Sequence, residues 1–129
     1  MSTFSPDAQT STITPPVRAD DQMPLHGIDH VEFWVGNAKQ AAYFFTHAYG
    51  FTETAYAGLE TGRRDRVSHV LQQGRIRLVL TGALRSDSEI AAHHHRHGDG
   101  VKVIALSVPD AARAHAEAVA RGARSLAEP

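Results

Sequence analysis

The residues best suited to bind a metal lie in an alternating stretch near residue 30. His30 and Glu32 stand two positions apart in GIDHVEFWV and share one side with Trp34. A period of two is typical of a strand, so these three side chains should point to one face of a sheet, where they could line a pocket. A neutral imidazole can ligate a metal, but a lone His and Glu are more often structural. The opposite face of this strand carries Val31, Phe33 and Val35, and it should face a hydrophobic core.

A second group of histidines is the run His93, His94 and His95, with His97 close behind. On a helix these positions form pairs three and four residues apart, a spacing that can hold a transition metal. The simpler interpretation is an exposed helix end, where the helix dipole favours cationic histidine. His69 and His115 have no partner at ligand spacing, and the sequence has no phosphate-binding glycine loop, Ser-His-Asp order or C-x-x-C motif. Motif spacing alone therefore assigns no chemistry.

The strand that carries His30 leads directly into a predicted helix. Asn37 is a good N-cap, Gln40 can complete a capping box, and Gly50 supplies a left-handed residue at the end. Apolar residues between the caps follow the spacing of one buried stripe, which we expect to pack against the side of Val31 and Phe33. This stripe consists of Ala41, Phe44, Phe45 and Ala48.

The rest of the chain adds strands and then restarts the pattern. Strands are predicted over 51–57, 67–72 and 76–81, the last two joined by a hairpin at Gln73 and Gly74. A short helix should lie within 86–98, a strand over 101–108, and a helix over 111–121 that begins at Asp110 as N-cap and buries Ala111, Ala114 and Ala118. The order is a βαβββ unit followed by the start of a second, so the predicted class is α+β, with one complete unit and a truncated second one. The chain is expected to be a fragment.

Composition limits the possible partners. The 129 residues include 13 basic and 14 acidic side chains, giving a net charge of −1, so nucleic acid is not an expected partner. Cysteine is absent, which excludes disulfides and thiolate ligands and is compatible with the cytoplasm. The sequence has no apolar run of membrane-spanning length and no signal peptide, so a soluble protein without membrane contact is expected. Residues 1–24, rich in Ser, Thr, Pro and Asp, are predicted to be a disordered and dispensable tail ahead of a domain over 25–129.

Three stretches resemble one family. The segments GIDHVEFWVGNAKQAAYFF, YAGLETGRRDRVSHVLQQGRIRLVLTGAL and HGDGVKVIALSVPD are similar to the N-terminal domain of 4-hydroxyphenylpyruvate dioxygenases, which belong to the vicinal oxygen chelate superfamily. The resemblance runs from Leu25 to Pro129, and FWVGNAKQAA and GLETGRRDRVSHV are its most specific parts. It implies an Fe(II) dioxygenase of tyrosine catabolism that converts 4-hydroxyphenylpyruvate and O2 to homogentisate and CO2.

The resemblance also implies where the iron is bound. In that family two His and one Glu of the C-terminal domain hold the metal, and the N-terminal domain is a degenerate copy of the same module. His30 occupies the place of the first ligand, Val103 stands at the place of the second, and the third falls beyond Pro129. We therefore expect no catalytic, cofactor-binding or metal-ligating residue on this chain, and Fe(II) only in the full-length enzyme. The resemblance further implies a homo-oligomer when the protein is full length.

Three other interpretations remain at this stage. 4-Hydroxymandelate synthase is similar in sequence and uses the same substrate and metal, but hydroxylates the benzylic carbon. A metal-free binding module of the bleomycin-resistance type also pairs βαβββ units, although both units should then be complete. An extradiol ring-cleaving dioxygenase would share the two-domain plan but not the GLETGRRDRVSHV stretch.

Overall fold

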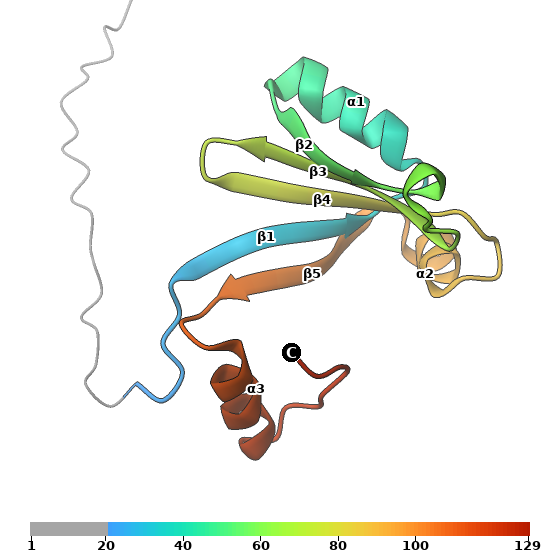
Figure 1. Ribbon diagram of the computed structural model, residues 1–129. Coiled ribbons are helices and arrows are strands. Elements are labelled where there is room, and N and C mark those ends of the chain that lie inside the picture. The colour runs from blue at the N-terminus through green and yellow to red at the C-terminus, as the bar shows by residue number, and fades with distance from the viewer. Residues whose placement is uncertain (1–20) are drawn as a thin grey trace, which may run out of the picture.

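The computed structural model describes residues 21–129 as one five-stranded mixed sheet with three α-helices (Figure 1). Strand β1 and β4 are parallel, whereas the other neighbouring strands are antiparallel, and the strand order is β2-β3-β4-β1-β5. The elements in chain order are β1 (Gly27–Trp34), α1 (Ala38–Tyr49), β2 (Thr52–Ala57), a one-turn 3-10 helix (Leu59–Thr61), β3 (Arg66–Gln73), β4 (Ile76–Ala83), α2 (Glu89–His97), β5 (Gly100–Ser107) and α3 (Ala111–Ala120). The predicted α+β class and element order are confirmed.

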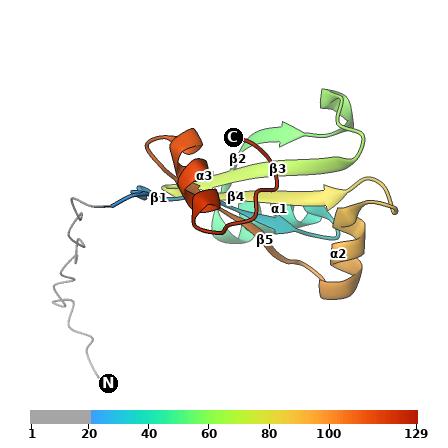
Figure 2. The same cartoon turned by 90° about the horizontal axis from the view of Figure 1, so that it is seen from below.

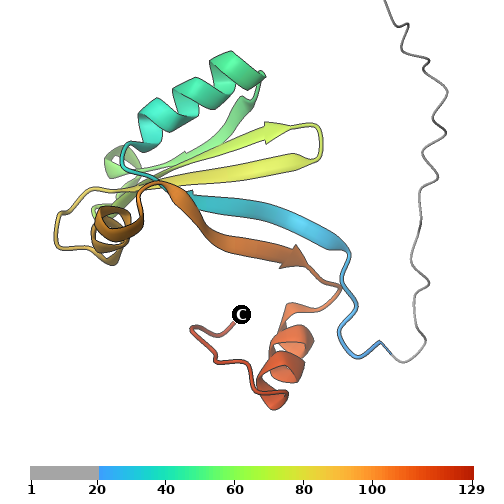
Figure 3. The ribbon, with the colours of Figure 1, turned by 180° about the vertical axis from the view of Figure 1, so that it is seen from behind.

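Helix α1 lies across one face of the sheet (Figures 1 and 3). Asn37 is the N-cap as predicted, because its Oδ1 accepts the Gln40 backbone N–H at 3.0 Å, and the helix ends at Gly50 in the left-handed region with φ 75°. The return bond from the Gln40 side chain that a capping box requires is not among the hydrogen bonds of residues 21–129. The core beneath it joins Ala42 of the helix to leucines of β3 and β4, with Val31 and Phe33 at its margin. The predicted face is therefore correct, but β3 and β4 supply most of the contact. The buried leucines are Leu71, Leu78 and Leu80.

One part of the helix prediction is wrong. Phe45 is half-buried against the core, but 53% of Phe44 is exposed, and Ala48 is exposed as well. The most buried helix residues are Ala38 and Ala42, so the buried stripe is rotated from the predicted one. Their small side chains allow the helix to approach β3 and β4 closely, and this rotation leaves Phe44 at the edge of the contact.

The opposite side of the sheet, here called the polar face, is defined by the strand register. Ser68 of β3 pairs with Thr81 of β4, which pairs with Trp34 of β1. The adjacent row joins Val70, Val79, Glu32 and Val103 across β3, β4, β1 and β5. Because paired residues in a sheet point to the same side, these rows share one face, and Leu71 and Leu80 point to the other.

Helices α2 and α3 lie at opposite ends of the sheet (Figure 2). Ser88 caps α2 and Asp110 caps α3, each accepting the backbone N–H three residues on, as expected for α3. The burial predicted for α3 is wrong at Ala111, which is exposed, and only partial at Ala114 and Ala118, because no residue of this helix is buried against the sheet. Most of the predicted tail lies outside the described residues, and 21–24 have no regular structure. No helix within 21–129 has the length and apolar character needed to span a bilayer.

Candidate functional site

His30 lies on β1 in a network of charged side chains. Its Nδ1 is 2.8 Å from Asp29 Oδ2, and Arg77 Nη1 of β4 donates to both Asp29 oxygens at 3.1 and 3.2 Å. The hydrogen bond from His30, assisted by the Arg77 charge, holds the pKa of Asp29 below its usual value. When Nδ1 donates to Asp29, only Nε2 of His30 remains free to ligate a metal.

The place of the second family ligand does not complete a metal site around His30. Val103 stands directly opposite Glu32 in the β1–β5 register, and His30 is opposite Ala105. The valine is 39% exposed and offers only an alkyl group, which cannot donate an electron pair. Within residues 21–129 no three histidine, aspartate or glutamate side chains come together as a possible metal site. The residues present therefore do not fit a tightly held iron.

The histidines of α2 have different environments. The His93 ring meets the Trp34 ring edge-on with centroids 5.2 Å apart, and His97 lies 4.6 Å from His93. His94 instead turns to Asp99, with Nε2 2.9 Å from Oδ1. His95 and His97 are exposed, as expected for a helix end, but His93 and His94 are half-buried. Burial first, and then the positive charge of Lys102, lowers the pKa of His93.

Trp34 does not line an open pocket as its place in the sequence predicts. It is 7% exposed, because His93 of α2 covers one side and Lys102 Nζ lies 4.5 Å from its ring centroid. The ammonium over the indole face is a cation–π contact. Helix α2 therefore closes the Trp34 end of the polar face, and Glu32 and His30 remain on its more accessible part.

Asp99 is a residue that spacing along the chain did not single out. Its Oδ1 accepts the Gly36 backbone N–H at 2.8 Å as well as facing His94. This bond joins the turn between β1 and α1 to the residue before β5, which is 63 positions away in sequence. A side chain at Gly36 would require the His94 ring to move, since an added Cβ would lie 2.7 Å from that ring.

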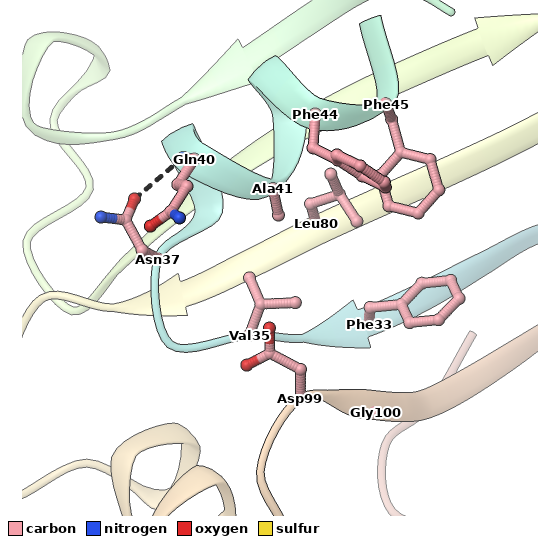
Figure 4. Close-up of a pocket in the computed structure, with 10 residues that line it drawn as sticks. All are labelled: Phe33, Val35, Asn37, Gln40, Ala41, Phe44, Phe45, Leu80, Asp99 and Gly100. Atoms are coloured by element: carbon pink, nitrogen blue, oxygen red, sulfur yellow. Dashed lines mark hydrogen bonds between the residues drawn. The ribbon is translucent and has the colours of Figure 1, made fainter. Parts of the chain in front are cut away.

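A groove lies on the helix side of the sheet, between α1 and β1 (Figure 4). Its cavity of about 470 Å³ has aromatic walls from Phe33, Phe44 and Phe45, and Asn37, Gln40 and Asp99 form its polar rim. Asn37 and Asp99 each already accept a backbone N–H, so the rim serves mainly to fix the start of α1. The groove can receive an apolar group, but it assembles no nucleophile with a base.

His69 and His115, which have no possible co-ligand nearby in the sequence, each contact a polar side chain in the structure. His69 is buried, and its Nδ1 is 2.9 Å from Glu53 Oε1 on β2, with the Tyr56 ring beside it. His115 Nε2 is 2.9 Å from Ser125 Oγ. Sequence reasoning missed the first pair because it is set by strand register across 16 residues.

The sequence matches a family model described as the N-terminal domain of hydroxyphenylpyruvate dioxygenase, over residues 19–129. It is 48% identical over 106 residues to a 4-hydroxyphenylpyruvate dioxygenase of Dictyostelium discoideum, covering 81% of this chain and 29% of that protein. The dioxygenase of Danio rerio is 48% identical over 101 residues, which cover 78% of this chain and 25% of that protein. The dioxygenase of Coccidioides posadasii is 39% identical over 138 residues, which cover 97% of this chain and 34% of that protein. The chain thus spans about a quarter to a third of the length of these relatives.

Solved structures with the same fold belong to the vicinal oxygen chelate proteins. A triple mutant of 4-hydroxymandelate synthase from Streptomyces coelicolor matches with a TM-score of 0.78 and 36% identity, covering 82% of this chain and 32% of that one. A methylmalonyl-CoA epimerase of the same organism matches with a TM-score of 0.70 and 24% identity, covering 81% and 77%. The epimerase likeness supports the fold alone.

Proposed function

Because the chain belongs to the family of N-terminal domains of hydroxyphenylpyruvate dioxygenases, we propose that it is the N-terminal part of such an enzyme. The enzyme would convert 4-hydroxyphenylpyruvate and O2 to homogentisate and CO2. The observation that carries the proposal is the family match over residues 19–129, supported by relatives at 39–48% identity that bear this name. Its substrates would be the keto acid and O2.

Within that enzyme, we assign this part of the chain a structural role. His30 is hydrogen-bonded to Asp29, and Val103 occupies the place of a second ligand, so only one of the family's ligand places on this chain carries an imidazole. A single neutral imidazole is a weak anchor for Fe(II). The iron is therefore proposed to lie in the C-terminal domain of the full-length protein. The five-stranded sheet of this chain is proposed to support that domain.

A second candidate is 4-hydroxymandelate synthase, which the structural match at 36% identity favours. The dioxygenases are more similar in sequence, at 39–48%, and we therefore rank homogentisate formation first. Both candidate enzymes use the same substrate, so the product of the full-length protein distinguishes them. We further propose a homo-oligomer in the cytoplasm for the full-length protein.

The proposal is tested by grafting. Residues 25–129 replace the aligned segment of the Dictyostelium discoideum dioxygenase, and product formation is followed by chromatography with 4-hydroxyphenylpyruvate, O2, Fe(II) and ascorbate. We expect homogentisate and a normal iron content. A folded, iron-loaded graft that makes no homogentisate contradicts the proposal. The second candidate is tested on the full-length protein that contains this chain, where 4-hydroxymandelate as the product selects the synthase.

Two variants of the graft control the assignment of roles. His30→Gln removes the surviving imidazole and should leave the iron content unchanged. Leu80→Asp buries a charge in the core and should abolish both folding and product. If His30→Gln lowers the iron content, the metal is bound partly by this domain and the structural role is wrong.

A further inference from the structure

The polar face carries a basic cavity whose lining does not include His30. The cavity, of about 260 Å³, is lined by Ala57, Arg63, Arg66 and Ser68, at the end of β2 and the start of β3. Three of its four lining residues belong to GLETGRRDRVSHV, one of the stretches most specific to the family, and the proposed structural role gives this stretch no function. A hollow with two guanidinium groups and a hydroxyl has the donors that oxyanions require.

The loop that presents Arg63 is fixed by hydrogen bonds. The Arg63 backbone N–H donates to Gly58 O at 2.9 Å, and Thr61 Oγ1 accepts the Gly58 N–H at 2.8 Å. Further along, the Leu84 N–H donates to Asp65 O at 3.0 Å, which ties the loop to the end of β4. A loop held in this way loses less entropy when a ligand binds.

The charges of the cavity leave an excess of positive groups. Arg66 uses Nε to donate to Asp65 Oδ2 at 2.7 Å, so its two terminal nitrogens remain available. In the described part of the chain, no carboxylate lies within ion-pair distance of Arg63. Two guanidinium groups and one carboxylate give a local charge of about +1, which attracts a small anion.

Ser68 can supply a hydroxyl donor from the floor of the cavity. Its Oγ is 2.9 Å from Thr81 Oγ1, and Thr81 is fully buried. When Thr81 donates its hydroxyl hydrogen to Ser68 Oγ, the Ser68 hydrogen is free to point into the cavity. The two hydroxyls then donate in one direction, and a chain of this kind strengthens the last donor.

We propose that this cavity binds a small oxyanion, a phosphate or a carboxylate, through Arg63, Arg66 and Ser68. The inference goes beyond the proposed function and does not depend on it, because the cavity contains none of the residues at the places of the iron ligands. A planar carboxylate and a tetrahedral phosphate each present two oxygens that a guanidinium group can bind in a bidentate manner.

The test uses the ¹⁵N-labelled 129-residue chain and two probes at constant ionic strength, sodium phosphate and sodium pyruvate. Saturable shifts are expected at the amides of Gly58, Arg63 and Ser68 with at least one probe. The probe that saturates at lower concentration identifies the oxyanion as phosphate or carboxylate. Shifts that fail to saturate with both probes overturn the proposal.

Variants locate the binding. The double variant Arg63→Gln with Arg66→Gln should lose saturable binding, and Arg63→Gln alone should weaken it about fivefold, as for an exposed charge pair. The single variant keeps the test decisive should the double variant not fold. The matched control is Arg75→Gln in the turn between β3 and β4, which should bind like the parent. Unchanged affinity in Arg63→Gln overturns the proposal.

Discussion

Leu80 is the side chain whose truncation should damage this fold most clearly. It is fully buried on β4, in the core cluster with Ala42, Leu71 and Leu78. Leu80→Ala removes three buried carbons at about 0.8 kcal/mol each and leaves a cavity, so the free energy of unfolding should fall by about 3–4 kcal/mol. For a domain of about 100 residues, a loss of this size lowers the melting temperature by more than about 10 °C.

The assay is urea unfolding followed by the fluorescence of Trp34, the single tryptophan of the chain, which is buried in the folded state. The matched control is Phe44→Ala, because this larger side chain is 53% exposed and should lose less than about 1.5 kcal/mol. The reasoning is refuted if Phe44→Ala costs as much as Leu80→Ala. That result would return Phe44 to the buried stripe predicted from the sequence.

Three further predictions follow from individual contacts. Gly36→Ala should displace the His94 ring, which lies 2.7 Å from the added Cβ, and thermal melting should show a lower stability than the parent. Because the pKa of His93 is lowered in the folded state, the unfolded state binds more protons below about pH 6.5. Stability contributed by this group is therefore present above that pH and lost as the pH falls, and His93→Gln should flatten this dependence in urea titrations. Val103→His should place an imidazole opposite Glu32, one residue pair along the polar face from His30, and raise the affinity for Zn²⁺ in calorimetry at least tenfold, whereas Val103→Ala should not.

Local signals in the sequence predicted the elements well. The alternation around Val31 predicted β1, and the caps Asn37, Gly50 and Asp110 predicted where helices begin and end. Each of these signals depends on residues within one turn or one strand. The hairpin at Gly74 was predictable for the same reason, and its φ of 56° is the left-handed conformation that such a turn favours.

Contacts between distant segments were not predictable in this way. The pairing of His69 with Glu53 depends on the register of β2 on β3, which includes a bulge between Glu53 and Ala55. The contact of Asp99 with Gly36 depends on where β5 joins the sheet, next to β1. The exposure of Phe44 depends on the rotation of α1, which a periodic stripe leaves undetermined by about one position.

From its surroundings we propose that His30 has a structural role, which requires no metal. Its hydrogen bond holds Asp29 as a carboxylate, and that carboxylate accepts two hydrogen bonds from Arg77 on the neighbouring strand. These bonds link β1 to the start of β4, ahead of Val31 and Leu78, the first residue pair that joins the two parallel strands. An exposed charge network of this kind adds little stability, but it fixes the direction in which the β1 strand enters the sheet. The imidazole at the place of a ligand is thus accounted for by its neighbours, and Val103 opposite Glu32 removes the second donor that a metal site would need.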